Sequence, residues 1–138
     1  MSYDLMVFDP IKAPRDRADF LQWFEAQTEW SEDQGYEDAS ITAPALRAWY
    51  DEMKVTFVPM NGPDSPMKPD LPPESPLWED NRVTGYTIGR DVIYVDFRWS
   101  AAEIAREAVV RLAEKHKVGF FDVSSGDGLF AFPGDKYI

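Results

Sequence analysis

Apolar and polar positions along this chain repeat with two different periods, and each period predicts one kind of element. An apolar run from Tyr3 to Phe8 is closed by Asp9 and Pro10, which predicts a buried strand because proline cannot donate a hydrogen bond to a strand ladder. β-Branched and aromatic runs predict four more strands, over 83–88, 92–97, 120–124 and 129–132. The first two of these are separated by a short glycine-containing segment, which is typical of a hairpin.

Three other segments place their apolar residues three and four positions apart, which predicts amphipathic helices. These helices span Pro14 to about Thr28, Thr42 or Pro44 to about Lys54, and Ser100 to about His116 or Lys117. At the start of the third helix, Ser100 and Glu103 match a capping box. Gly119 is predicted to follow its end in the left-handed conformation.

The predicted element order is β, α, α, long loop, β, β, α, β, β. With the second helix and the last strand set aside, this order becomes β-α-β-β-α-β, which is that of the ferredoxin-like split β-α-β fold. We therefore expect a single α+β domain over residues 1–138. Its antiparallel sheet would carry helices on one face, with an extra helix and a C-terminal hairpin strand. Another α/β sandwich is the main alternative.

The segment between the second helix and the hairpin is dominated by proline. Seven prolines fall within the 22 residues from Phe57 to Trp78. This density excludes helix and central strand, and it predicts a long proline-rich loop at about 57–78. Apolar residues recur along the segment, which favours a loop packed on the body of the protein. A mobile segment is the alternative.

Composition excludes several classes of protein. The chain contains no cysteine and one histidine, so we expect no disulfide framework, no metal site and no cofactor. The N-terminus lacks a basic region before its apolar run, and no apolar run approaches the length of a membrane span, so we expect a cytoplasmic protein. A sequence pI near 4.4 argues against binding to nucleic acid or to a membrane surface.

The net charge of −11 resides in the first 80 residues. That part has 17 acidic and 6 basic side chains, whereas the remainder has 8 of each. The run from Ala18 to Leu46 contains seven acidic residues and no Lys or Arg. A negative electrostatic field accelerates the encounter with a positively charged partner and orients that partner. The charge pattern therefore indicates a basic protein partner. A solvated face that serves solubility alone is the alternative.

Aromatic side chains are interleaved with these acids, and this combination is typical of tight protein interfaces. Trp30 and Tyr36 lie in the predicted connector between the first two helices, and they are the better candidates for contact. The predicted partner-binding surface consists of Glu25, Glu29, Trp30, Glu32, Asp33, Tyr36, Glu37 and Asp38.

No catalytic motif of comparable strength is present, and we expect no catalytic residues. His116 falls in the last turn of a predicted helix, where a surface or capping role is typical. Asp4 and Asp96 are carboxylates within apolar strands, and strand alternation puts Asp96 on the same face as Tyr94. An alternative small-molecule site on the open sheet face, under the proline-rich loop, would consist of Tyr86, Tyr94, Asp96 and Arg98.

Three segments carry a resemblance to known proteins: Met1–Phe8, the loop Met60–Asp64 and the segment Gly119–Ser125. In these, the chain resembles a group of small bacterial proteins that are similar in size and acidity to the immunity proteins of polymorphic toxin systems. The resemblance implies a cognate inhibitor of a secreted or contact-delivered toxin, often a basic nuclease or nucleotide-acting enzyme.

Three functions remain as hypotheses. The first is an inhibitor that covers a basic partner with its acidic and aromatic surface. The second is a small-molecule-binding protein or small enzyme that uses the open sheet face. The third is a module that self-associates through a strand edge or the proline-rich segment.

Overall fold

Five strands form one open antiparallel sheet, so the protein is α+β. The structure is a computed structural model that describes residues 2–67 and 69–135. Its strands are β1 (Tyr3–Phe8), β2 (Gly85–Ile88), β3 (Val92–Phe97), β4 (Gly119–Phe121) and β5 (Phe130–Ala131). They are arranged in the order β2-β3-β1-β4-β5. Residue 1 and residues 136–138 of the predicted domain, and residue 68 of the predicted loop, lie outside the described residues.

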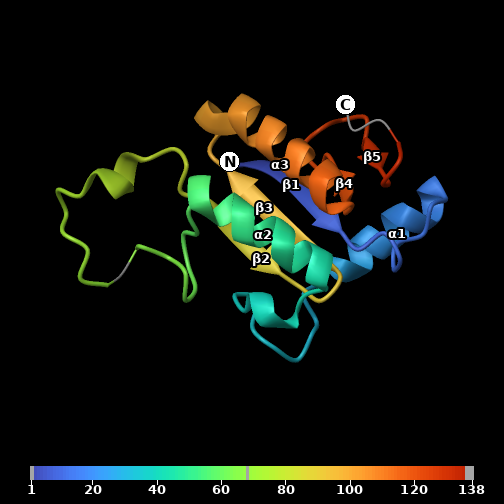
Figure 1. Ribbon diagram of the computed structural model, residues 1–138, viewed down its shortest axis with the longest axis horizontal. Coiled ribbons are helices and arrows are strands. Elements are labelled where there is room, and N and C mark those ends of the chain that lie inside the picture. The colour runs from blue at the N-terminus through green and yellow to red at the C-terminus, as the bar shows by residue number, and fades with distance from the viewer. Residues whose placement is uncertain (1, 68, 136–138) are drawn as a thin grey trace.

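Helices cover both faces of this sheet. The helices α2 (Pro44–Thr56) and α3 (Ala102–His116) pack together over one face, which we call the first face, and α1 (Arg17–Gln27) packs against the opposite or second face (Figure 1). Alternation along β1 explains this arrangement, because successive side chains point to opposite faces. Leu5 and Val7 belong to the core under α2 and α3, whereas Met6 and Phe8 belong to the core under α1.

The prediction that the first and third helices share one face is therefore wrong. The pair on one face is α2 and α3, and the extra helix is α1. The aromatic side chains of α1 account for its position, since Phe20 stacks on Phe130 at 4.4 Å between ring centroids and also contacts Phe8 and Phe121. Spacing within a helix defines its buried side but does not define which sheet face receives it.

The ends of α3 also differ from the sequence prediction. A short 3-10 turn, Trp99–Ala101, precedes the helix, so Ser100 does not cap it. The residue in the left-handed conformation after the helix is Lys117, with φ of 57°. Gly119 instead begins β4, where a Cβ atom would lie 2.1 Å from the ring of Phe8. Glycine is needed there for close packing rather than for its backbone freedom.

The proline-rich segment projects from the sheet as a long loop (Figure 1). Its first part runs beside β2, where Thr84 donates its backbone N–H to Val58 O and accepts from Met60 N, both at 2.8 Å. Near its end, a 3-10 turn at Pro76–Glu79 presents the carbonyl oxygen of Trp78 to Arg98 Nη2 at 3.2 Å. Both ends are thus bonded to the β2–β3 hairpin. None of the helices within the described residues is long and apolar enough to cross a membrane.

Candidate functional site

Helix α1 covers only part of the second face, and the uncovered part carries two carboxylates. Asp4 of β1 and Asp96 of β3 are directly paired in the antiparallel register. Residues opposite each other on neighbouring strands bring their Cβ atoms to within about 5.5 Å. Both side chains lie on the same face as Tyr94, which confirms the alternation expected for Asp96. Two negative charges therefore sit side by side on the open part of the sheet.

Asp4 is held in place by neighbouring hydroxyl groups. Ser2 Oγ and Tyr94 Oη each donate a hydrogen bond to its carboxylate at 2.5 Å. Its backbone is bonded to Ser124, which follows β4, through Asp4 N to Ser124 Oγ at 2.8 Å and Ser124 N to Asp4 O at 3.1 Å. Burial, and then the hydrogen bond to Asp4, raise the pKa of Tyr94. The tyrosine is therefore a stable hydrogen-bond donor at neutral pH.

Asp96 has no comparable support. Its carboxylate accepts no hydrogen bond from any described residue. Gly85 of β2 lies opposite, and a Cβ atom there would be 2.4 Å from Asp96 Oδ2. Burial, and then the charge of Asp4, raise the pKa of Asp96 above its ordinary value. A pair of carboxylates with one unsatisfied member attracts a positively charged group such as a guanidinium or an ammonium.

A metal ion is a poorer match for this arrangement. The described residues contain no group of three or more His, Cys, Asp or Glu side chains that could hold one.

The predicted small-molecule site is only partly assembled. Tyr94 and Asp96 lie together on the open face, and Arg98 follows them at the end of β3, where it contacts the proline-rich loop. Tyr86, however, is paired with Val95 and points to the first face. Its hydroxyl is buried and donates to the carbonyl oxygen of Phe57 at 2.6 Å. The assignment of Tyr86 to this site is wrong, because the hairpin register gives it the opposite orientation from Tyr94.

The segment 29–38, which we call the acidic connector, joins α1 to the first face by passing around the edge of β2. Trp30 lies on the second face, with its ring 5.9 Å from that of Tyr94 and 5.3 Å from that of Tyr36. The carbonyl oxygen of Tyr36 then accepts a hydrogen bond from Ile88 N at 2.8 Å. Ala39, directly after the connector, is buried in the core of the first face. Through Trp30 and Tyr94, the two predicted sites form one continuous surface.

Trp30 and Tyr36 are half-buried in this arrangement. The indole packs edge-on against two tyrosine rings, and the Tyr36 hydroxyl accepts a hydrogen bond from Glu32 N at 2.6 Å. Trp30 has a φ of 54°. This left-handed conformation is uncommon for a bulky residue, and packing against the two tyrosine rings holds Trp30 in it. These two aromatic residues fix the path of the connector instead of standing free for contact.

Glu32 attaches the connector to the hairpin turn. Its carboxylate accepts from Gln34 Nε2 at 2.6 Å and from Arg90 N at 3.2 Å, and it lies 3.8 Å from the Arg90 guanidinium. A Cβ atom on Gly89 would be 2.7 Å from Glu32 Oε2. Glycine at the turn therefore allows this carboxylate to approach the backbone. Within the connector, Glu32 is the described acid that has an ion pair with a basic side chain.

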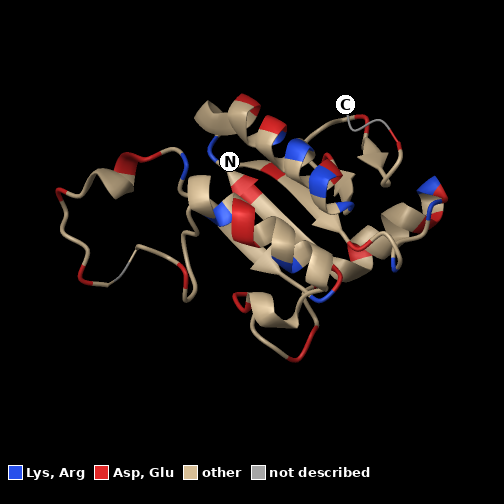
Figure 2. Cartoon of the chain, in the orientation of Figure 1, with Lys and Arg blue, Asp and Glu red and all other residues tan. Residues whose placement is uncertain are grey.

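The remaining acids of the predicted surface are exposed. None of them lies within ion-pair distance of a Lys or Arg among the described residues. Glu37 accepts from Asn61 Nδ2, and Asp38 accepts from Ser40 N at 2.9 Å. Hydrogen bonding from the Ser40 side chain, and then from the Ser40 backbone N–H, lowers the pKa of Asp38. Figure 2 shows the acidic residues along this loop below the sheet. The exposed acids without an ion pair are Glu25, Glu29, Asp33, Glu37 and Asp38.

Sequence reasoning missed the residues that support this surface. Ser124, which follows β4, bonds to the backbone of Asp4, and Gly85 of β2 lies against Asp96. The only sequence signal for either was a glycine inside a predicted strand. The chain matches no known protein family model, no curated protein and no solved structure.

Proposed function

We propose that this protein binds a basic protein partner through an acidic surface formed by the acidic connector and the Asp4–Asp96 pair. The observation that carries the proposal is that four exposed acids without an ion pair, Glu29, Asp33, Glu37 and Asp38, lie within one ten-residue segment, in contrast to the two acids of α2. On α2, Asp51 is paired with Arg47 and Lys54, and Glu52 is paired with Lys115 and His116. The exposed acids of the connector have no such neutralisation, so their field extends into solvent.

The local structure supports binding rather than solubility alone. A flexible acidic loop would lose conformational entropy when it binds a partner. A loop whose backbone is already fixed in the free protein does not lose that entropy on binding. The connector is bonded to Ile88 through Tyr36, to the hairpin turn through Glu32, and to the sheet face through Trp30. Its carboxylates are therefore presented from a defined backbone, as a complementary basic surface would require.

An inhibitory role follows from the same surface. An acidic face that covers a basic active site excludes its anionic substrate, and encounter would be fast at low ionic strength. The resemblance to immunity proteins of polymorphic toxin systems supports this role, with a toxin as the partner and the cytoplasm as the place of action. Cognate inhibition is thus the specific form of the proposal.

The carboxylate pair favours one alternative. A small cationic ligand would satisfy the unbonded Asp96 and relieve its repulsion with Asp4. The proline-rich loop reaches the end of β3 through Trp78 and Arg98, next to that position. A small-molecule site on the open sheet face is the second candidate function.

We also propose that the fold is ferredoxin-like. The strand order β2-β3-β1-β4, all antiparallel, supports this, as do two helices on one face. On this proposal α1 and β5 are additions to the basic unit.

A matched pair of variants tests the binding proposal. The connector variant E29Q/D33N/E37Q/D38N removes four exposed charges from the acidic surface, and D70N/E74Q/E79Q/E114Q removes four exposed charges from other regions. Tagged wild type and both variants are used to capture proteins from lysate of the source organism, followed by mass spectrometry. We expect one basic protein to be retained by wild type and by the second variant, and lost from the first. Equal retention by all three would refute the proposed surface.

A further inference from the structure

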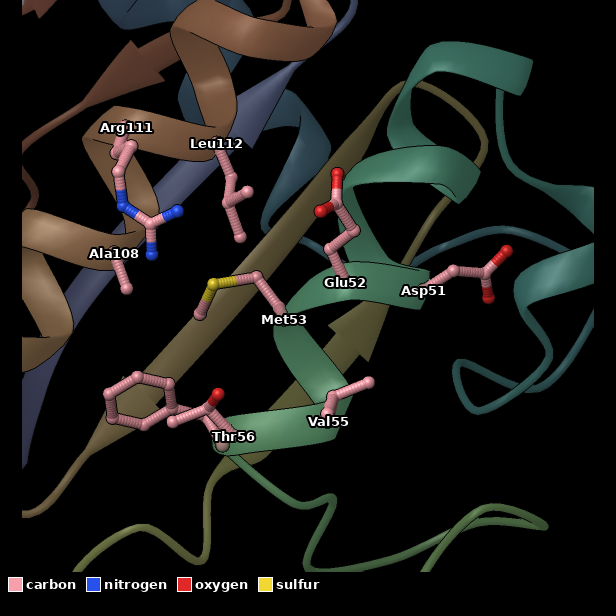
Figure 3. A pocket seen from close by; sticks show the side chains of 9 residues that line it. Asp51, Glu52, Met53, Val55, Thr56, Ala108, Arg111 and Leu112 are labelled. Atoms are coloured by element: carbon pink, nitrogen blue, oxygen red, sulfur yellow. The ribbon is translucent and has the colours of Figure 1, made fainter.

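A groove lies between α2 and α3 on the first face, away from the acidic connector. Its volume is about 320 Å³, within the range of small-molecule sites. Met53, Phe57, Ala108 and Leu112 form an apolar floor. Figure 3 shows Met53 of α2 and Leu112 of α3 pointing toward one another, while Asp51 points away from α3. The groove continues into a second depression that shares Phe57 and Ala108.

Two arginines line this continuous groove. Arg111 of α3 borders both depressions, and Arg82, which precedes β2, borders the second. Neither guanidinium has an ion pair or a side-chain hydrogen bond with the described residues. Arginine side chains without an ion pair are unexpected next to an apolar surface in a chain with 14 basic and 25 acidic residues.

Two of the three acids that line the groove are already paired with basic side chains. Asp51 is paired with Arg47 at 3.4 Å and with Lys54 at 3.3 Å. Glu52 is paired with Lys115 at 2.9 Å and with His116. Both carboxylates are thus already engaged at the rim. The groove combines an apolar floor with an unneutralised guanidinium at its edge.

We propose that this groove binds a small amphipathic carboxylate, whose alkyl chain lies on the floor while its carboxylate pairs with Arg111. The chain would cover Met53, Leu112 and Ala108, and each methylene removed from water would strengthen binding. The guanidinium would donate two parallel hydrogen bonds to the carboxylate, in the bidentate geometry that arginine favours. Arg82 lies farther along the groove and adds positive potential. The site is distinct from the acidic connector and does not depend on it.

Glu107 is the one acid that competes for this position. It lines the second depression, four residues before Arg111 on α3, and no ion pair joins the two side chains. Its negative charge opposes an entering carboxylate. Replacement of Glu107 by glutamine should therefore strengthen binding, whereas replacement of Arg111 by glutamine should weaken it. A groove that only accepts apolar molecules would respond to neither change.

Titration of ¹⁵N-labelled full-length protein with octanoate, followed by NMR, tests the proposal. Octanamide serves as an uncharged ligand of the same shape. Acetate serves as a ligand that has the carboxylate but lacks the long alkyl chain. We expect octanoate to shift the amide signals of Met53, Ala108 and Leu112 with one-site saturation, and to bind about tenfold more tightly than octanamide. R111Q should abolish that difference, E107Q should increase it, and R15Q, a charge change on a distant segment, should leave it unchanged.

Equal affinity for octanoate and octanamide, shifts confined to other residues, or unchanged octanoate binding by R111Q would each overturn the proposal. Arg111 is exposed, so its replacement should leave the fold intact, and the dispersion of the NMR spectrum reports this directly. The connector variant should bind octanoate as wild type does. Failure of this site and failure of the partner-binding surface are therefore separate results.

Discussion

Asp4 and Asp96 face each other across β1 and β3, and only Asp4 is hydrogen-bonded. Tyr94 donates a hydrogen bond to Asp4 at 2.5 Å. The Asp96 carboxylate is partly buried beside the negative charge of Asp4 and accepts no hydrogen bond from the described residues. Such an arrangement lowers the stability of the folded chain in return for a site that attracts positive charge. Its cost is measurable, and it should depend on pH.

Replacement of Asp96 by asparagine should stabilise the protein at neutral pH. Burial and the charge of Asp4 raise the pKa of Asp96, so folding disfavours its ionised form. The penalty is absent below the unfolded pKa, near pH 4, and it grows as pH rises through the folded pKa. We expect D96N to gain about 0.5–1 kcal/mol at pH 7, after allowance for solvent screening, and almost nothing at pH 3.

Urea denaturation of wild type and D96N at both pH values measures this difference. E114Q, which removes an exposed carboxylate from α3, is the control and should change stability little at either pH. A loss of stability in D96N at pH 7 would show that the carboxylate has a favourable partner, contrary to the proposed environment.

Replacement of Gly119 by alanine should destabilise the protein strongly. The added Cβ would lie 2.1 Å from the ring of Phe8, which is fully buried and contacts Phe20 and Phe132. Because that ring has no free space in which to move, we expect a loss of about 2–3 kcal/mol. Thermal or chemical denaturation checks this value. G126A, at a position with open space around it, is the comparison and should cost far less.

Replacement of Trp30 by alanine should loosen the acidic connector without unfolding the sheet. The change removes ring contacts with Tyr36 and Tyr94, and we expect a loss of about 2 kcal/mol. The backbone hydrogen bond from Ile88 N to Tyr36 O reports the connector directly. Hydrogen exchange at the Ile88 amide should accelerate in W30A, while exchange at Val95 in the centre of the sheet should change little. Equal acceleration at both amides would mean that Trp30 belongs to the global core.

Replacement of Tyr86 by phenylalanine should affect stability and leave binding unchanged. The hydroxyl is buried and donates to the carbonyl oxygen of Phe57 at 2.6 Å, which would lose its partner. We expect a loss of about 1–2 kcal/mol in urea denaturation. Capture of the basic partner should match that of wild type. If the folded Y86F variant failed to capture the partner, Tyr86 would belong to the binding site after all.

Periodicity predicted the strands and helices of this chain because burial on one side imposes a repeat on the sequence. The period-two pattern of 92–97 also gave the correct face for Asp96. The pattern did not give the face that α1 covers, because Phe20 and its neighbours would be equally buried on either side. The orientation of Tyr86 depends on the hairpin register, which places Gly85 opposite Asp96 and Tyr86 opposite Val95.

The candidate site was predictable in charge but not in geometry. A run of acids without Lys or Arg is visible in the sequence, and most of them are exposed. The inward orientation of Trp30 was not visible, because it arises from contact with Tyr94, more than 50 residues later in the chain, and Tyr36 packs in turn against Trp30. The support of Glu32 by Arg90 and Gly89 is equally non-local. Spacing within a segment carries no information about such contacts.

The most direct test of the acidic surface is the association rate of the captured basic partner, measured by biolayer interferometry over a series of salt concentrations. Wild type and D70N/E74Q/E79Q/E114Q should associate rapidly at low salt and slow steeply as salt increases. The connector variant E29Q/D33N/E37Q/D38N should associate slowly, with a much shallower dependence on salt. An association rate and salt dependence in the connector variant equal to those of wild type would contradict the proposal that this surface steers and binds the partner.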